Sequence, residues 1–372
     1  MNIKALELEN FLSFECAKVE LGKLNVLVGP NASGKSNFVK ALMFLSELVR
    51  SNLGTAWRSL GFASFQDIVF NFDLSKEVKL RIKLNVEGED LIYEVVMRKD
   101  AILREKLMRD DGTILLARTE KGWSYLATNT ERIGPFSPLG RHDVALTYCV
   151  RKANAHSVLI KAKQIVEGIR TYSFEANRIR SKASVGFNLE LTRNGSNLAQ
   201  VLFSLLTSDR KRFFIIEEAL RSLVPEVEEL GVPTTEDGSK TYITLREKGL
   251  KTPLKYPNIS DGTLRLLAFI TAIHLGGPLV AFEEPENCVH PYLFQALIDI
   301  CRQGPSQVVI TTHSPYLVDK VEPEELLLVV KQAGRSTIRR LTKEEKGLVK
   351  KMLEDGFTLG ELWYMGEFGG TP

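Results

Sequence analysis

The sequence predicts an α/β fold that carries an antiparallel β subdomain and a helical lobe. A short apolar run at 25–28 ends at a glycine and is followed by helical spacing over 36–50, which is typical of a buried strand leading into a helix. Short alternating runs between 78 and 117, separated in part by turn residues, indicate an antiparallel meander. From about residue 155 to 230 the spacing of apolar residues becomes mostly helical.

The other elements follow from the same two periodicities. They are strands at 3–8, 17–21, 279–282 and 308–311, and helices at 197–206, at 210–223, from Asp261, after Pro291 and at 343–354. The stretch from Leu264 to Phe282 has almost the length of a membrane span, but Arg265 and His274 lie within it and a Gly-Gly-Pro turn interrupts it. It therefore indicates a buried helix and a buried strand, and no membrane partner is expected.

The composition is that of a folded chain of about two domains or lobes. The 372 residues are 44% hydrophobic and 26% charged, and a chain of this length can build a core without disulfides. The cysteines Cys16, Cys149, Cys288 and Cys301 are scattered and form no CxxC pair, which favours a reducing compartment. The first residues form no apolar signal segment, so we expect a cytoplasmic protein.

Positive charge is concentrated in one part of the chain. The formal net charge is only +3, yet residues 151–193 contain nine lysines and arginines and three glutamates. A local basic stretch can meet a polyanion, and Arg178, Arg180 and Lys182 are the candidate contacts to DNA. A solvated face with no ligand is an equally open alternative.

A phosphate-binding loop follows the strand at 25–28. Residues 29–36 match the pattern GxxxxGK[ST] in full, and the glycines let backbone N–H groups turn towards a phosphate at the start of a helix. Lys35 is expected to reach the β- and γ-phosphates, and the Ser36 hydroxyl to bind Mg²⁺. The predicted nucleotide-binding residues here are Gly29, Pro30, Asn31, Ala32, Ser33, Gly34, Lys35, Ser36 and Asn37. An ordinary glycine turn is the alternative, but such matches are rare between a strand and a helix.

Two acidic residues end a second apolar strand. Glu283 and Glu284 follow 279–282, and charges at the end of a buried strand are costly unless they meet a cation. This fits a Walker B element in which Glu283 helps to hold Mg²⁺ and Glu284 is the general base. Two acids at an exposed helix start are the alternative. His313 follows the strand at 308–311, and we expect it to contact the γ-phosphate, although such a histidine is more often a cap or a core group.

The ordered set of motifs resembles the ABC-type ATPase heads of the SMC, RecF and OLD-like group, over nearly the whole chain. The matching segments are Leu8–Phe14, the phosphate loop, Asn194–Ala199, Ser260–Arg265, Phe282–Glu286 and Thr312–Pro315. The resemblance implies a P-loop NTPase fold of the ABC-type head. It implies ATPase lobe I at 1–150 with the phosphate loop and antiparallel sheet, helical lobe II at 151–262, and the rest of lobe I at 263–372.

The resemblance also implies roles for individual residues. Ser260 and Gly262 belong to the signature motif, here SDGT instead of the LSGGQ of transporters, which completes the ATP site of an opposing subunit. His313 matches the switch histidine. Gln66 is the candidate Q-loop residue that senses Mg²⁺, although Asp67 competes for that role. A plain helix N-cap at Ser260 is the alternative for the signature, and both functions can coexist.

Two departures from the group narrow the expectation. The interval between the phosphate loop and the signature shows no sustained heptads, so a compact RecF-like head without a long coiled coil is expected. Only about 59 residues follow His313, too few for the nuclease domain of OLD proteins. A separate effector or nuclease subunit would then supply any nuclease chemistry.

The resulting hypothesis is a Mg²⁺-dependent ATPase that forms an ATP-linked homodimer. Its closure would gate DNA contact or a partner effector, in genome maintenance or anti-phage defence. An ATP-binding dimerisation switch with little turnover is one alternative, which the intact Glu284 disfavours. The ATPase subunit of a transporter is another, which the SDGT signature disfavours. The aromatic tail at 359–366 either packs on the core or docks a partner.

Overall fold

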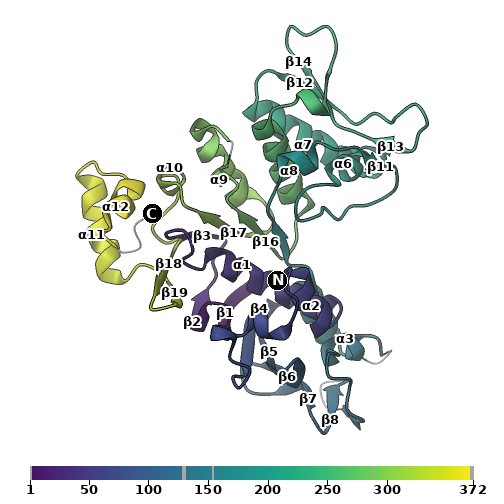
Figure 1. Ribbon diagram of the computed structural model, residues 1–372, viewed down its shortest axis with the longest axis vertical. Coiled ribbons are helices and arrows are strands. Elements are labelled where there is room, and N and C mark those ends of the chain that lie inside the picture. The colour runs from purple at the N-terminus through teal and green to yellow at the C-terminus, as the bar shows by residue number, and fades with distance from the viewer. Residues whose placement is uncertain (1, 128–130, 153–154, 288, 369–372) are drawn as a thin grey trace.

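The computed structural model describes residues 2–127, 131–152, 155–287 and 289–368. Figure 1 shows a parallel sheet at the centre, an antiparallel sheet below it, and a lobe of helices and small sheets above it. The C-terminal helices lie to the left of the central sheet. The mixed α/β architecture with an antiparallel sheet and a helical lobe confirms the predicted fold class.

The central sheet has six strands and is parallel except for its last strand. Its order is β10 (Arg170–Tyr172), β16 (Leu279–Glu283), β17 (Gln307–Thr312), β3 (Leu24–Val28), β18 (Leu326–Gln332) and the antiparallel β19 (Arg335–Arg339). Alternate residues of β3 face two cores: Leu27 packs with α1 (Lys35–Arg50), and Val26 packs with α8 (Asp261–Leu275) and α9 (Phe294–Gln303). Burial on both faces explains the continuous apolar runs.

An antiparallel sheet of eight strands covers the other side of α1. In spatial order it is β2 (Phe14–Glu20), β1 (Asn2–Phe11), β4 (Val78–Val86), β5 (Glu89–Arg98), β6 (Ala101–Arg109), β7 (Ile114–Thr119), β8 (Gly122–Leu126) and β9 (Arg132–Phe136). The meander predicted at 78–117 is confirmed, and the sheet extends beyond it. Also here are α2 (Leu53–Ser59), η1 (Phe65–Ile68), η2 (Phe70–Phe72), α3 (Ala145–Val150) and α4 (Ser157–Glu167).

The upper lobe contains both of the helices predicted between 197 and 223. Its elements are α5 (Ala176–Ile179), β11 (Ala183–Ser184), α6 (Leu198–Ser208), α7 (Arg210–Leu223), β12 (Val227–Gly231), β13 (Lys240–Thr241), β14 (Thr244–Glu247), β15 (Leu254–Lys255) and η3 (Tyr256–Asn258). The small sheets were not expected, because three of their strands contain only two residues each and carry no readable alternation. The domain boundary at 151 stays a prediction, since α4 packs on α1 and β10 pairs with β16.

The C-terminal helices pack against the segment that follows β17. They are α10 (Pro315–Val318), α11 (Lys343–Glu354) and α12 (Leu359–Met365), while η4 (Pro291–Leu293) precedes β17 and leads into α9. Leu362 and Trp363 are buried, and a Cβ on Gly360 would lie 2.2 Å from the Pro315 carbonyl oxygen, so α12 sits tightly on α10. Tyr364 and Met365 remain exposed. The aromatic tail therefore packs on the core by one face and presents the other to solvent.

The 264–282 stretch and three of the four cysteines lie within the described ranges. No described helix is both long and apolar enough to cross a bilayer, and the 264–282 stretch is divided between α8 and β16. Cys16 is an exposed free thiol, and Cys149 and Cys301 are buried free thiols. Cys288 lies outside the described residues. Burial raises the pKa of Cys149 to about 12, so this thiol is expected to be unreactive.

Replacing the buried Glu105 with leucine is expected to lower the free energy of unfolding by about 3 kcal/mol or more. Its carboxylate lies under α3, where it accepts hydrogen bonds from the Ala145 N–H at 2.6 Å, the Leu146 N–H at 2.9 Å and the Tyr93 hydroxyl at 2.9 Å. All three donors would lose their partner. Chemical unfolding of Arg104→Leu, an exposed change on the same strand, serves as the control. An equal loss in both variants would contradict the assignment.

Candidate functional site

The candidate site lies where three parallel strands end side by side. β3 leads into the phosphate loop, β17 leads to His313, and β16 leads to Glu284. The register aligns Thr312 with Val28, and Glu283 with Thr311, so the three strand ends are level. The carboxyl ends of parallel strands are the usual place for a ligand in an open α/β sheet.

The phosphate loop is held from below by both ends of the chain. Ser336 of β19 places its Oγ 2.6 Å from the Ser33 carbonyl oxygen and 2.8 Å from Ser13 Oγ. A Cβ on Gly29 would lie 2.1 Å from the Val329 carbonyl oxygen, and one on Gly34 would lie 2.5 Å from Ser336 Oγ. The glycines therefore allow a close approach that a side chain would block.

Lys35 is buried at the start of α1. Its ammonium donates to the carbonyl oxygens of Gly29 at 2.6 Å and Pro30 at 3.0 Å. Burial lowers the pKa of Lys35, while the carboxylates of Glu284 and Glu286 act in the opposite direction. The lysine thus lies between the loop and the carboxylates of Glu284 and Glu286. A phosphate bound here can replace the two carbonyl oxygens as the acceptor of its hydrogen bonds.

Glu284 and His313 lie in contact at the neighbouring ends of β16 and β17. Glu284 has a left-handed backbone with φ of 46°, which turns the chain away from β16 directly after the strand. One carboxylate oxygen lies 3.3 Å from His313 Nδ1, and the other accepts from Asn287 Nδ2 at 2.8 Å. About a third of the Glu284 side chain is exposed (36%), so water can reach the carboxylate.

Glu286 is a functional candidate that sequence reasoning did not assign. It is 6% exposed, and one of its carboxylate oxygens accepts a hydrogen bond from the Thr312 hydroxyl. The other oxygen is buried and has no hydrogen-bond partner among the described residues. Burial raises the pKa of Glu286. Only the tertiary contact with β17 reveals this residue, because in the sequence it is one acid among three.

Glu283 points to a different partner from Glu284. Its carboxylate forms an ion pair with the guanidinium of Arg193, and only 14% of its side chain is exposed. The segment before α6 supplies this arginine, which the sequence offered only as part of the basic stretch. The role of Glu283 as a metal ligand therefore stays a prediction, and Arg193 holds its carboxylate in this structure.

The signature residues lie on the upper lobe, at the N-terminus of α8. Ser260 Oγ accepts from the Thr263 N–H at 3.1 Å, so the serine is an N-cap as the plainer interpretation held. Ser260 and Asp261 are exposed, and Gly262 is partly exposed. The N–H groups of a 15-residue helix thus face outward at this point and favour an anion.

Two further predicted site residues, Gln66 and Asn37, form hydrogen bonds to other groups of the protein. Gln66 donates from Nε2 to the Phe72 carbonyl oxygen at 3.1 Å, and Asp67 caps η1 by accepting from the N–H of Ser64 at 2.8 Å. Asn37 donates to Ser13 Oγ at 2.8 Å. The contacts of Gln66 with Mg²⁺ and of Asn37 with a nucleotide remain predictions.

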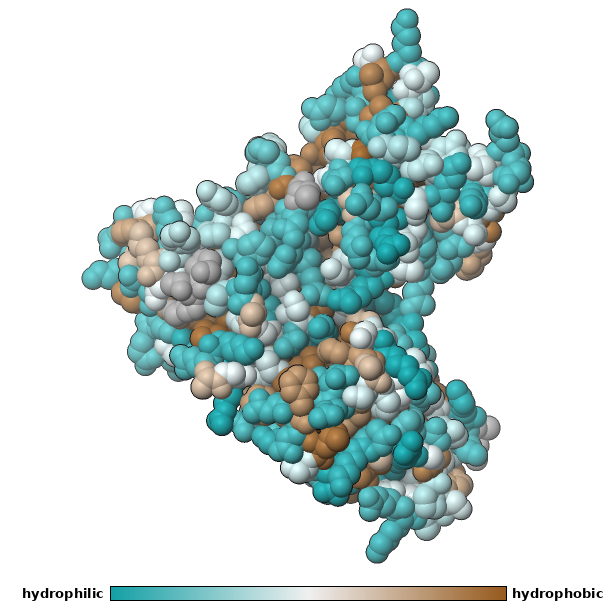
Figure 2. Space-filling model, in the orientation of Figure 1, coloured by the Kyte–Doolittle hydropathy of each residue, from teal (hydrophilic) through white to brown (hydrophobic). Residues whose placement is uncertain are grey.

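The basic stretch at 151–193 does not form one continuous positive surface. Six of its charges meet carboxylates, in the pairs Lys161–Glu87, Lys163–Glu167, Arg170–Glu190, Arg178–Glu175, Arg180–Asp261 and Arg193–Glu283. Arg180 also donates to the Ile259 carbonyl oxygen at 2.8 Å. Lys182 lies instead over the ring of Tyr242. Figure 2 shows that the face in view is hollowed between the upper lobe and the antiparallel sheet.

The residues at the strand ends fit a nucleoside triphosphate with Mg²⁺. The Ser33 hydroxyl is buried and has no hydrogen-bond partner in the described part of the chain, and Gly34 caps α1 without a side-chain bond. The loop thus offers free donors at a helix N-terminus, together with the Lys35 ammonium. Ser36 is exposed beside them and can supply the hydroxyl that Mg²⁺ prefers.

The comparisons with known proteins agree with this geometry. The family model described as "AAA domain, putative AbiEii toxin, Type IV TA system" matches residues 24–319. An OLD nuclease of Thermus scotoductus is 23% identical over 377 residues, which span 96% of this chain and 67% of that protein. A DNA replication and repair protein RecF of Lactobacillus johnsonii is 35% identical over 91 residues, 23% of this chain and 24% of that protein.

The solved structures show the same fold. An SMC head bound to the C-winged helix domain of ScpA superposes with a TM-score of 0.64 at 14% identity, over 93% of this chain and 99% of that chain. An Smc head of Pyrococcus furiosus with an extended coiled coil gives a TM-score of 0.56 over 95% of this chain, also at 14% identity. The chain belongs to the AAA domain family whose model it matches, and its fold is that of an SMC-, RecF- and OLD-like ABC-type ATPase head.

Proposed function

We propose that this protein is a Mg²⁺-dependent ATPase whose two copies close head to head around two ATP molecules. Closure would gate contact with nucleic acid or with a partner effector. The observation that carries the proposal is the division of the site: Lys35, Glu284 and His313 lie together at the strand ends, whereas Ser260 faces outward at the end of α8. A second copy can supply its Ser260 helix end to the first copy's phosphate loop.

The proposed reaction is attack of water on the γ-phosphorus of ATP. Glu284 takes a proton from the water, the bond from phosphorus to the β,γ-bridging oxygen breaks, and ADP and phosphate leave. Asn287 orients the Glu284 carboxylate at 2.8 Å, and His313 lies on its other oxygen. Mg²⁺ bound by Ser36, and by Glu283 if Arg193 releases it, would neutralise phosphate charge.

Two other functions use the same fold. An ATP-binding dimerisation switch needs the phosphate loop and the signature but not Glu284, so the exposed carboxylate beside His313 favours hydrolysis. A transporter ATPase would work with a separate membrane subunit, and no described feature favours it. The relatives named for DNA repair and the SMC head solved with ScpA support a nucleic-acid or protein partner.

Mixing two inactive variants is expected to restore turnover if the site is shared between copies. Lys35→Ala removes one phosphate loop, and Ser260→Arg places a bulky cation at one signature. Half of the dimers in an equimolar mixture are mixed, and each has one intact site. Phosphate release should therefore return to about a quarter of the wild-type rate, if the sites act independently.

The matched control is a mixture of Lys35→Ala with Glu284→Gln. Both changes disable the strand-end half of the site, so no mixed dimer has an intact pair of halves and no activity should return. Recovery in this control, or no recovery with Ser260→Arg while both variants remain folded by circular dichroism, would contradict the shared site.

A further inference from the structure

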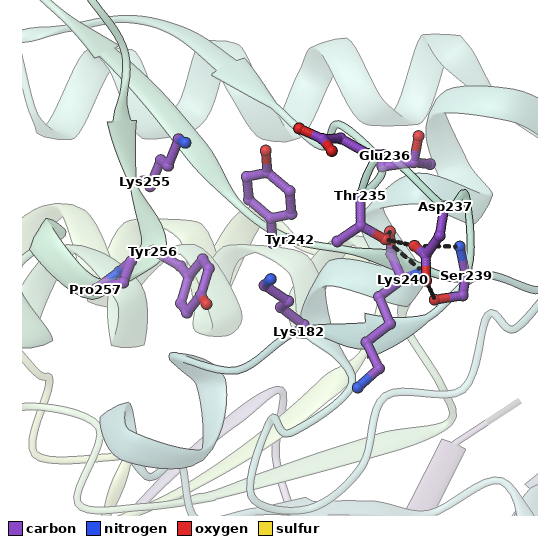
Figure 3. A pocket seen from close by; sticks show the side chains of 11 residues that line it. Lys182, Thr235, Glu236, Asp237, Ser239, Lys240, Tyr242, Lys255, Tyr256 and Pro257 are labelled. Atoms are coloured by element: carbon purple, nitrogen blue, oxygen red, sulfur yellow. Dashed lines mark hydrogen bonds between the residues drawn. The ribbon is translucent and has the colours of Figure 1, made fainter.

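A cavity in the upper lobe combines lysines with aromatic rings. It measures about 760 Å³ and is lined by the 234–240 loop, by Lys182 after α5, by Tyr242, and by 255–257 before α8. Figure 3 shows the Lys182 ammonium beside the rings of Tyr242 and Tyr256, with the 235–240 loop forming another wall. The nucleotide site at the strand ends contributes none of these residues.

Three lysines bring unneutralised charge to this cavity. Lys182, Lys240 and Lys255 are exposed, and none of them forms an ion pair with a described carboxylate. This separates Lys182 from the six charges of the 151–193 stretch that are paired. An ammonium without a partner at the wall of a concave surface attracts phosphate groups.

The two tyrosines supply flat apolar surface in the same place. The rings of Tyr242 and Tyr256 are both partly exposed, and their centroids are 5.7 Å apart at an interplanar angle of 62°. The Lys182 ammonium lies 5.9 Å from the centroid of the Tyr242 ring. Half-exposed rings beside cations are the combination that holds unpaired nucleic-acid bases, since every base has a face that can stack.

The acidic residues of the cavity do not cancel this charge. Asp237 is bound within its own loop by the hydroxyls of Thr235 at 2.5 Å and Ser239 at 2.7 Å, and these hydrogen bonds lower the pKa of Asp237 to about 2. Glu236 is exposed to solvent. Three lysines line the cavity against these two carboxylates, so its formal charge stays positive. One of the two carboxylates, that of Asp237, also shapes the loop.

We propose that this cavity binds nucleotides of a single-stranded nucleic acid, with the lysines on its phosphates and an unpaired base against Tyr256. Bases in a duplex are stacked on one another and cannot enter a concave site to meet a ring. A strand also brings several phosphates to Lys182, Lys240 and Lys255 at once, whereas a free mononucleotide brings one or few.

The cavity is joined to the signature by the chain itself. Tyr256 begins η3, which ends two residues before Ser260. Arg180, two residues before Lys182, donates to the Ile259 carbonyl oxygen at 2.8 Å and pairs with Asp261. A bound strand can thus bias the position of Ser260. This last link rests on the proposed function, but binding in the cavity does not.

The test measures binding without ATP, by fluorescence anisotropy of a labelled oligothymidylate of about 12 nucleotides. Tyr256→Leu should weaken affinity about tenfold, while Tyr256→Phe, which keeps the ring, should bind like the wild type. The double variant Lys240→Ala/Lys255→Ala should reduce the slope of log affinity against log salt by about 1.4. Lys350→Ala/Lys351→Ala, two exposed lysines on α11, is the matched control and should leave both quantities unchanged.

Each outcome decides between sources of the ligand. Weaker binding of the same sequence as a duplex, and no displacement by equimolar thymidine monophosphate, support the strand. Equal affinity for duplex, displacement by the mononucleotide, or equal loss in Tyr256→Phe and Tyr256→Leu would overturn it. If the mixing experiment fails while these binding results hold, the cavity stands and the ATP-linked dimer falls. If the mixing experiment restores turnover but no strand binds, the ATP-linked dimer stands and the binding role of the cavity is wrong.

Discussion

Glu284→Gln is expected to lower ATP turnover by about 10²- to 10⁴-fold while ATP binding is retained. The amide keeps the shape of the side chain and can still accept from Asn287 Nδ2, now 2.8 Å from one carboxylate oxygen. It cannot take a proton from water. The contacts of Lys35 with the loop do not involve Glu284 directly, so the nucleotide should still bind.

The measurement is phosphate release with and without nucleic acid, combined with light scattering to follow size. A variant that binds ATP and cannot hydrolyse it should accumulate as a dimer, because the contacts that favour closure persist. Glu344→Gln, on the exposed first turn of α11, is the control and should behave like the wild type. Unchanged turnover in Glu284→Gln would show that Glu284 is not the general base, and together with a stable ATP-bound dimer of the wild type it would favour the dimerisation switch.

Lys35→Ala is expected to weaken ATP binding about 10- to 100-fold, because a charge-assisted hydrogen bond to phosphate contributes roughly 1.5–3 kcal/mol. In the structure its ammonium donates hydrogen bonds to the carbonyl oxygens of Gly29 and Pro30, the first two residues of the loop. In the alanine variant water solvates those carbonyl oxygens. The variant also lacks the ammonium that we expect to bind the β- and γ-phosphates.

Thermal melting separates this loss from damage to the fold. ATP at a hundred times its dissociation constant should stabilise the wild type by about 2.7 kcal/mol, and the same ATP concentration should stabilise Lys35→Ala much less. Lys40→Ala, five residues further along α1, is the control. If Lys35→Ala keeps the full stabilisation by ATP, the assignment of Lys35 is wrong.

The sequence predicted the parts of the site that are contiguous in the chain. The phosphate loop is readable because its backbone and side-chain donors come from nine consecutive residues, and Glu284 is readable because a buried strand ends beside it. Glu286 contacts Thr312 of the next strand, a pairing that only the fold creates, and Asn287 contacts Glu284 within a local turn that no motif marks. Pattern reasoning has no access to such pairings.

The upper lobe illustrates the second limit of the sequence. β11, β13 and β15 contain two residues each, so no period of two can be seen in them. The cavity at Tyr256 depends on these strands bringing 182, 240 and 255 together. For the basic stretch at 151–193 the sequence indicated more than the fold contains. Its charges are concentrated in the sequence, but in space they pair with carboxylates.

The three serines that meet under the phosphate loop have a consequence for protein synthesis. Ser336 Oγ supports the loop by bonding the Ser33 carbonyl oxygen and Ser13 Oγ, and β3 lies between β17 and β18, which are made about 300 residues later. A growing chain on the ribosome therefore carries the complete GxxxxGK[ST] pattern for most of its translation without the support that shapes it. The phosphate loop is therefore expected to take its folded shape only after strands β17 to β19 have emerged.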